Sequence, residues 1–419
     1  MRQQCVAALL LIGAFSHFVS LEQPAHAAPP STASYGLDEV MTLAAEHNPS
    51  IAEANGTIAQ SRGLREIAGA YPNPSIDGTF GPGITREQLG NVSVLEKAVR
   101  LNQPLEWPGM RQARQRAADA DVAASQAGFA DARLRVLADA KVAFYQLLLA
   151  QRDVELSTQS LGIVQDLFQS IKARVEAGQA RPFESVKAGV EVQKVSKDLN
   201  RAQNNLVVAR VRLDMATGGA LGQDFTVRGD FASPRESRSL DDLIGRAVEQ
   251  HPLLVRLKKQ IEKAGHSVAQ ERQSLIPSVT VSGEYHAEAA EKAFLAVVSV
   301  PLPLWYQRQG HISAALGAME RAKAEQARTQ NELVTAFTEQ MQEARTATQQ
   351  IDVFERGLLK QAEEALRIAR ISFQQGAASL LDLIDAQRVY RQMLLEYAEA
   401  RAAFSISRAR LERWTGELR

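Results

Sequence analysis

LDEVMTLAAEHNPSI, residues 37–51, recurs 203 residues later in the chain as LDDLIGRAVEQHPLL, residues 240–254. Three further pairs follow in the same order: NPSI (73–76) and IPSV (276–279), LNQPLEW (101–107) and SVPLPLW (299–305), and RLDMATG (212–218) and RLERWTG (410–416). Self-similarity at a nearly constant offset indicates a duplicated structural unit. We therefore expect two structural repeats, 28–218 and 239–416, joined by a glycine-rich linker at 219–238.

Each repeat contains two candidate strands after its first helix. SVTVSGEY (278–285) alternates apolar residues with serine, threonine and glycine, which is typical of a sheet whose two faces meet different surroundings. The predicted strands are 74–84 and 92–105 in the first repeat, and 277–287 and 293–303 in the second. Each has about the 9–11 residues that a tilted strand needs to cross a bilayer. No segment has the run of about 18 apolar residues that a membrane-spanning helix requires, so a membrane crossing would use strands.

Long helical runs follow the strands and predict hairpins at about 111–217 and 308–415. No proline occurs from Arg111 to Ala177, which allows a helix of roughly 100 Å. Apolar residues recur there every seven positions, as in helices that supercoil around one another; they are Leu147, Val154, Leu161, Phe168 and Val175. Gly178 and Gly376 are placed to end the two long helices.

This layout predicts an assembly rather than a monomer. Four strands cannot close a barrel, and open sheet edges are not tolerated in lipid. Three copies would supply twelve strands and a ring of long helices. The fold class is therefore expected to be mainly α with a small β part: a homotrimer that forms a twelve-stranded outer-membrane β-barrel continued by a periplasmic α-helical tunnel.

The N-terminus resembles a secretory signal peptide. Arg2 precedes an apolar stretch from Val6 to Phe15, and the small residues Ala25 and Ala27 predict cleavage after Ala27, which makes 1–27 the signal peptide. An uncleaved anchor is the alternative. Lys plus Arg and Asp plus Glu both number 48, so the chain has no broad positive charge that would favour a nucleic-acid partner.

The duplicated layout of strands and hairpins resembles the TolC-like outer-membrane efflux family, with GQARPFESVKA (178–188) and GAASLLDLIDA (376–386) at the two helical turns. LNQPLEWPGMRQAR (101–114) and PLPLWYQRQG (301–310) are most similar to its heavy-metal branch, the CzcC and CnrC type. The resemblance implies a trimeric channel in the cell outer membrane with a long periplasmic extension. Its partners would be a periplasmic adaptor (membrane fusion) protein and an inner-membrane pump of the resistance–nodulation–division class. The cargo would be divalent cations such as cobalt, nickel, zinc or cadmium.

The same resemblance implies roles for residues at the helical turns. The turns would form the periplasmic tips that contact the adaptor, with these residues at the matching positions: Gly178, Arg181, Glu184, Gly376 and Ser379. Asp382 and Asp385 match acidic positions that surround the periplasmic entrance, where six carboxylates from three copies would favour cations. The alternative for the two aspartates is stabilisation of a helix N-terminus, and the alternative for the two glycines is helix capping alone.

Trp107, Trp305 and Tyr306 follow the strands, where a barrel has its belt of interfacial aromatic residues; packing at a strand–helix joint is the alternative. The histidines lack the spacing of a zinc site, so no dedicated metal site and no cofactor are expected. Nucleophile-elbow, P-loop and dinucleotide motifs are also missing, which argues against an enzyme.

Two other functions fit parts of the pattern. The same channel fold could export drugs or other organic compounds, because only the short motifs after the strands separate the two cargo classes. A periplasmic coiled-coil scaffold or adaptor without a pore is the third reading. Paired strands of membrane length and two equivalent hairpins argue against it.

Overall fold

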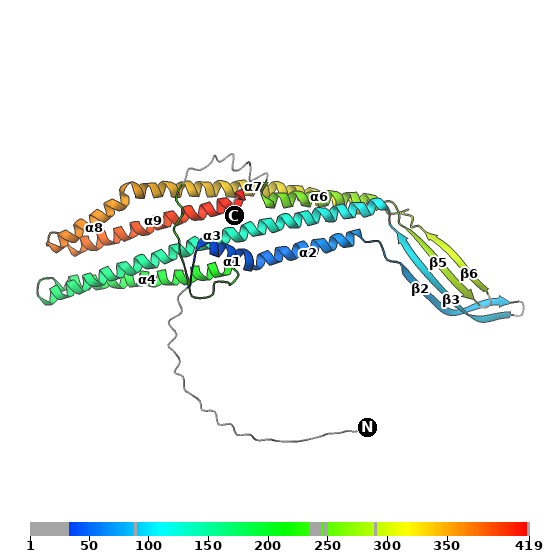
Figure 1. Cartoon of the computed structure of the whole chain (residues 1–419), viewed down its shortest axis with the longest axis horizontal. Helices are drawn as coiled ribbons and strands as arrows, with labels where there is room; N and C mark the ends of the chain where they lie inside the picture. Colours follow the sequence, from blue (N-terminus) through cyan, green and yellow to red (C-terminus); the bar gives the residue numbers. More distant parts are fainter. Residues whose placement is uncertain (1–32, 88–89, 235–244, 246–249, 289–290, 417–419) are drawn as a thin grey trace, which may run out of the picture.

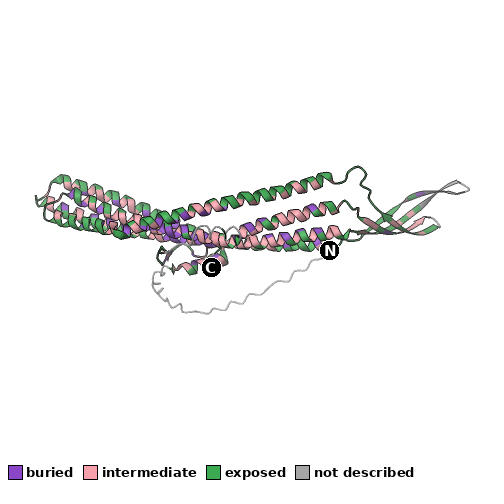
Figure 2. Ribbon diagram, turned by 90° about the horizontal axis from the view of Figure 1, so that it is seen from above, coloured by how far each residue is buried: buried purple, intermediate pink, exposed green. Residues whose placement is uncertain are grey.

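The computed structural model describes residues 33–87, 90–234, 245, 250–288 and 291–416. It is a long helical body with a four-stranded sheet at one end (Figure 1). The predicted signal peptide and the predicted helix starting at Leu240 lie outside the described residues, apart from Gly245 and Gln250. Buried residues gather in the middle of the helical body, whereas the strands are mostly exposed (Figure 2).

The first repeat is built on one uninterrupted helix, α3 (Pro108–Glu176). Its first residue is a proline, which fits the N1 position of a helix because that amide would be unpaired anyway. The helix ends at Glu176, and the chain turns at Gly178, whose φ of 72° lies in the left-handed region. The amide of Gln179 donates to the carbonyl of Arg174 at 2.7 Å and closes this end. The chain then returns along α3 as α4 (Pro182–Ala216).

Helix α4 covers only part of α3, and α1 (Leu37–His47) and α2 (Pro49–Gly69) also pack on α3. Asn48 caps α2 by accepting a hydrogen bond from the amide of Ser50 at 2.9 Å. Its Nδ2 donates to the carbonyl of Ala216 at 2.8 Å, so the start of α2 meets the end of α4. The helix that continues the line of α4 is therefore α2, and not α1, the first helix of the repeat.

The second repeat has the same order but is interrupted. Helix α6 (Pro252–Gln273) leads to the sheet, and α7 (Gln309–Val353) leads away from it. A π-helical segment, Phe354–Leu358, joins α7 to α8 (Leu359–Gln374). Gly357 has a φ of 155° inside this segment, so the helix is broken at a position where α3 is continuous. Helix α9 (Leu380–Thr415) returns along α7 and α8 and also contacts α3.

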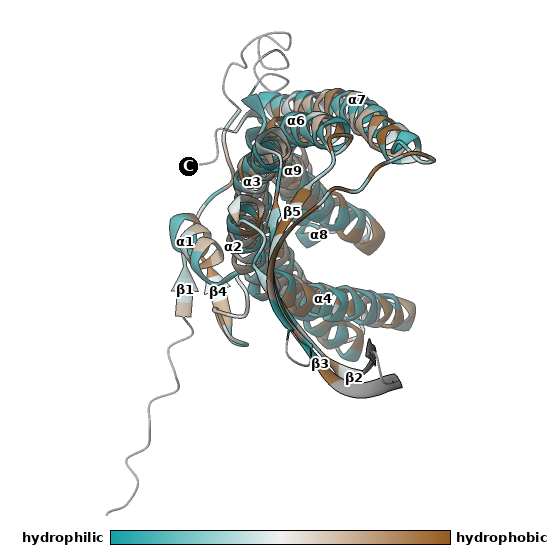
Figure 3. Ribbon diagram, turned by 90° about the vertical axis from the view of Figure 1, so that its right-hand side faces the viewer, coloured by the Kyte–Doolittle hydropathy of each residue, from teal (hydrophilic) through white to brown (hydrophobic). Residues whose placement is uncertain are grey.

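The sheet combines both repeats in the antiparallel order β2-β3-β5-β6. The strands are β2 (Ser75–Glu87), β3 (Gly90–Leu105), β5 (Val279–Glu288) and β6 (Glu291–Ser299). Strand β6 ends four residues before the predicted 303, because Pro301 and Pro303 have no amide hydrogen to donate to a neighbour. Seen from the sheet end, the strands follow a curve (Figure 3).

The predicted linker at 219–238 contains a strand, β4 (Phe225–Val227), which pairs in parallel with β1 (Ala33–Tyr35). Phe225 is fully buried, and its ring contacts Tyr35 edge to face at 6.0 Å between centroids. The main hydrophobic cluster surrounds this pair and includes Val40, Phe144 and Leu213. The segment between the repeats therefore belongs to the core and does more than connect them.

The seven-residue pattern is visible in the packing of α4. Ala188, Val195, Ala202 and Ala209 are buried; in the parallel stripe of larger residues, Val192, Leu199 and Leu206 are half-buried and Leu213 is buried. On α3, Ser157, Val164 and Ile171 are buried, whereas Val154, Leu161, Phe168 and Val175 are half-buried. Contacts within one chain thus bury the stripe of mostly smaller residues. Of the larger side chains they bury Leu147 and Leu213 in the main cluster and leave the others partly accessible.

Candidate functional site

The two helical turns lie at the end of the molecule opposite the sheet (Figure 1). Gly178 and Gly376 have φ values of 72° and 74°, a conformation that L side chains rarely adopt. An added Cβ would meet no atom within 4 Å at either position. Helix capping therefore accounts for both glycines, and the space around them is open.

The two turns share a small core. Ile171 and Ala188 of the first hairpin and Leu380 of the second form one buried cluster. The guanidinium of Arg174 lies 5.5 Å from the ring centroid of Phe373, which links the hairpins a second time. The structure therefore brings the two predicted tips together within one chain.

Other predicted tip residues occupy capping positions. Arg181 is the N-cap residue of α4 and is exposed, and Glu184 lies in the first turn, where a carboxylate is favoured by the helix dipole. Ser379 caps α9, because its Oγ accepts a hydrogen bond from the amide of Asp382 at 3.3 Å. The Ser379 amide donates back to Asp382 Oδ2 at 2.8 Å, which completes a capping box.

Replacing Leu380 by alanine should loosen the two tips from each other. The side chain is 5% exposed and fills the space between the hairpins, so we expect a loss of about 2 kcal/mol in the free energy of unfolding. Leu381→Ala is the matched control, because the neighbouring side chain is 57% exposed. Guanidinium unfolding, monitored by circular dichroism, would measure both variants. Equal midpoints for the two would contradict the shared core.

The two predicted entrance carboxylates are exposed and have local partners in one chain. Hydrogen bonds from the side chain and backbone of Ser379 hold the pKa of Asp382 below its usual value of 3.8, so this carboxylate is charged at neutral pH. Asp385 forms an ion pair with Arg388, one turn further along α9. The single chain thus shows the helix-capping role for Asp382, and a ring of carboxylates would require further copies.

The sheet has one polar and one apolar face. On the polar face, Asn102 Nδ2 donates to Asp77 Oδ2 at 2.6 Å, and Ser282 Oγ donates to Asn102 Oδ1 at 2.7 Å. The neighbouring pair Arg100 and Glu284 is joined at 2.7 Å from Nε to Oε2. These contacts link strands β2, β3 and β5. Sequence reasoning missed this network, and the alternation of polar residues along the strands was the available signal.

The opposite face of the sheet is mainly apolar and accessible to its surroundings, with Lys97 and Lys292 in one row of cross-strand neighbours. Its exposed apolar members are Ile76, Phe80, Leu95, Val99, Leu101, Leu105, Val281, Phe294 and Val298. Phe294 is 86% exposed, which is far more than a water-soluble sheet tolerates for a row of such residues. Among the residues that the structure describes, the outer edges of β2 and β6 pair with no strand. The arrangement suits a sheet with apolar surroundings on one side and water on the other.

The three predicted interface aromatics lie at the joint between the sheet and the helices. Trp107 caps α3 and is 48% exposed, and Trp305 and Tyr306 are 91% and 52% exposed. Trp107 and Tyr306 line a cavity of about 650 Å³ at this joint, and Trp305 does not line it. The high exposure of Trp305 excludes ordinary packing within the chain for that residue.

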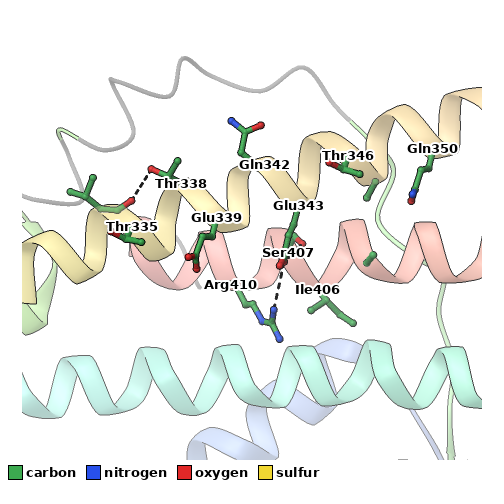
Figure 4. A pocket seen from close by; sticks show the side chains of 13 residues that line it. Thr335, Thr338, Glu339, Gln342, Glu343, Thr346, Gln350, Ile406, Ser407 and Arg410 are labelled. Atoms are coloured by element: carbon green, nitrogen blue, oxygen red, sulfur yellow. Dashed lines mark hydrogen bonds and ion pairs between the residues drawn. The ribbon is translucent and has the colours of Figure 1, made fainter.

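A groove of about 910 Å³ lies between α7 and α9 in the middle of the body. Figure 4 shows its lining of threonine, glutamine and glutamate side chains, with Glu343 next to Ser407 and Arg410. This lining includes no histidine or cysteine. Within the described part of the chain, no group of three or more His, Cys, Asp or Glu residues could hold a metal ion. None of the described helices is long and apolar enough to span a membrane.

The chain matches the family described as outer membrane efflux protein over residues 40–219 and 243–417. It is 28% identical over 377 residues to the cobalt-zinc-cadmium resistance protein CzcC of Cupriavidus metallidurans, covering 89% of this chain and 87% of that protein. It is 22% identical over 408 residues to the pyoverdine export outer membrane protein OpmQ of Pseudomonas aeruginosa, covering 91% and 83%. Its fold is similar to the crystal structure of the Campylobacter jejuni outer membrane channel CmeC, with a TM-score of 0.76, 16% identity and coverage of 91% and 85%.

Proposed function

Because the chain belongs to the outer membrane efflux protein family, we propose that it forms a trimeric channel that exports divalent heavy-metal cations. Membership of this family identifies the protein as an outer-membrane channel and not as an enzyme. The adaptor and an inner-membrane pump of the resistance–nodulation–division class would complete the export system. The cargo class of cobalt, nickel, zinc or cadmium is supported by the similarity to CzcC.

The two-faced sheet is the observation that carries the proposal. A four-stranded sheet with an exposed apolar face and two unpaired edges needs further strands before it can lie in lipid. Three copies would pair β2 of one chain with β6 of the next and close twelve strands. The apolar face would contact outer-membrane lipid, and the network of Asp77, Asn102 and Glu284 would line the water-filled interior.

The helical body offers matching surfaces for further copies. Helix α4 carries an exposed apolar stripe whose members are Val207, Val208, Val211 and Met215. Exposed apolar patches of this kind mark contacts with other proteins. In a trimer the tip residues Gly178, Arg181, Glu184, Gly376 and Ser379 would face the adaptor. Asp382 and Asp385 would surround the periplasmic entrance and favour cations over anions.

The N-terminal segment, the two repeats and the aromatic residues at the joint also have roles in the proposed channel. We infer that residues 1–27 are removed during export and that the mature chain starts at Ala28. The repeats would be 28–218 and 239–416 with the connecting segment 219–238 between them. Trp107, Trp305 and Tyr306 would lie at the periplasmic surface of the outer membrane, where amphipathic aromatic rings are favoured.

Two measurements test the channel and its cargo separately. Detergent extraction of separated membranes should give an outer-membrane species with the mass of three chains. A soluble monomer or an inner-membrane species would contradict the channel. Deletion of the gene should then increase sensitivity to cobalt, zinc, cadmium or nickel, and the intact gene should restore growth.

The alternative cargo is an organic compound, which the similarity to the pyoverdine exporter OpmQ favours. The same deletion strain distinguishes the two. Sensitivity to drugs or loss of pyoverdine export, with unchanged metal tolerance, would replace the metal proposal while leaving the trimeric channel intact.

A further inference from the structure

The duplication produces two equivalent joints, at which a return helix ends against the start of a helix that leads to the sheet. In the first joint, Asn48 caps α2 and bonds to the carbonyl of Ala216 at the end of α4. In the second, His251 caps α6 by accepting a hydrogen bond from the amide of Leu253 at 3.1 Å. Its ring lies 5.4 Å from that of Trp414, the counterpart of Ala216 in α9. Histidine thus stands where the first repeat has asparagine.

The two caps differ in how they respond to protons. An asparagine oxygen accepts a hydrogen bond at any pH, whereas a histidine nitrogen accepts only while it carries no proton. Because the Leu253 amide donates to Nδ1, the neutral ring must carry its hydrogen on Nε2. Protonation turns Nδ1 into a donor, so the hydrogen bond that caps α6 cannot coexist with the charged ring.

The surroundings of the ring are buried and incompletely paired. His251 is 2% exposed, and its Nε2 lies near the backbone of Arg413 without a hydrogen bond of good geometry. Asp131 on α3 is 1% exposed; its Oδ2 accepts from Arg135 at 3.2 Å, while its Oδ1 is unpaired. Arg413 on α9 has an unpaired Nε and lies over the Trp414 ring at 4.5 Å. Two helices, α3 and α9, therefore present unsatisfied polar atoms around one buried imidazole.

The charged groups around the ring shift the pKa of His251 in opposite directions. Burial lowers the pKa of His251 from its usual 6.5, and Asp131 raises it. The charge of Arg413 on α9 lowers the pKa, whereas the interaction with the Arg413 backbone raises it. Arg135 on α3 partly neutralises Asp131, and Asp139 on α3 acts on Arg413. Burial is the largest of these effects, so the folded joint favours the neutral ring.

We propose that His251 is a proton-sensitive cap that holds α6 against the end of α9 at neutral pH and releases this joint when it is protonated. Protonation removes the cap on α6, and the new charge can be met by the free oxygen of Asp131 on α3. Because α6 leads directly to β5, acid would loosen the attachment of the second strand pair while the asparagine joint of the first stays closed.

The sign of the pH dependence follows from the lowered pKa. The unfolded chain binds a proton at His251 more readily than the folded chain does. The stability contributed by the neutral cap is therefore complete above pH 6.5 and is lost as the pH falls from 6.5 through the lower folded-state pKa.

Trp414 provides a local probe for the test. We would replace Trp107 and Trp305 by phenylalanine in the full-length protein, which leaves Trp414 as its one tryptophan. Emission and melting temperature would be measured in detergent from pH 8 to pH 5. We expect the emission to titrate with a midpoint below 6.5, and the melting temperature to fall by roughly 2 °C over the same range, as for the loss of one helix cap.

Two variants decide whether His251 is responsible. His251→Asn installs the capping residue of the first joint and should abolish both pH-dependent changes. His266→Asn, a substitution further along the same helix, should leave both in place. If His251→Asn does not fold, His251→Ser supplies another capping side chain, and failure of both to fold would contradict a role limited to the cap. A titration that persists in a folded His251 variant, or a flat wild-type signal, would overturn the proposal.

Discussion

Ala296→Arg is expected to keep the protein out of the outer membrane. Ala296 lies in the middle of β6, on the same apolar face as Phe294 and Val298. An arginine that faces lipid near the bilayer midplane costs about 2–4 kcal/mol. Three copies in one barrel would triple this cost to about 6–12 kcal/mol, which is comparable to the whole stability of a folded domain. The amount of protein in purified outer membranes, detected by antibody, measures the effect.

Leu295→Arg is the matched control. Leu295 precedes Ala296 in the same strand and points to the polar face, where it lies opposite Glu284. An arginine there would face water and an acidic neighbour, so we expect normal amounts in the outer membrane. Equal loss of both variants would indicate general misfolding of β6. Normal amounts of both variants in the outer membrane would mean that the apolar face does not contact lipid.

Asp382→Asn combined with Asp385→Asn is expected to remove the cation preference of the channel. The exchange keeps side-chain size, and the amide oxygen of the new asparagine at position 382 can still accept hydrogen bonds at the start of α9. It nevertheless removes six negative charges from a three-copy entrance. Reversal potentials in a potassium chloride gradient across planar bilayers would measure the ion preference. We expect the reversal potential to show a clear preference for potassium over chloride in the wild type. In the double variant we expect a reversal potential close to zero, as for an unselective channel.

Asp352→Asn serves as the control for that measurement. Asp352 is a half-buried aspartate paired with Arg356, as Asp385 is paired with Arg388, but it lies at the end of α7, away from the turns. Its removal changes the net charge without changing the entrance. An unchanged reversal potential in the double variant would show that these aspartates only stabilise the start of α9.

The order of strands and hairpins could be predicted because its signals are local. Gly178 and Gly376 terminate helices through their own backbone conformation, and the alternation in residues 278–285 is a property of one strand. The strand β4 could not be predicted in the same way. Its three residues pair with Ala33–Tyr35, about 190 positions earlier, and each segment is too short to indicate a strand by itself.

The burial of polar residues inside the helical body could not be predicted from the sequence either. Asp131 lies on α3 among alanine, arginine and leucine, and Ser157 lies on the same helix between Leu156 and Thr158. Nothing in either neighbourhood marks the residue as buried. Ser157 is buried because α9 brings Arg391 to within 3.1 Å of its hydroxyl. Asp131 is buried where α6 and α9 meet α3. The seven-residue pattern specifies contact along each helix, but which stripe faces which partner depends on the neighbouring helices.

The break at Gly357 has a consequence for symmetry. One chain contributes an uninterrupted hairpin, built on α3, and a second hairpin. In the second hairpin the π-helical segment divides the helix that leads away from the sheet into α7 and α8. In a ring of three chains, continuous and divided hairpins would alternate around the axis. A divided helix can bend at its break, whereas a continuous one resists bending. If the periplasmic entrance opens by bending at these breaks, every second hairpin would move. The channel would then widen with threefold rather than sixfold symmetry.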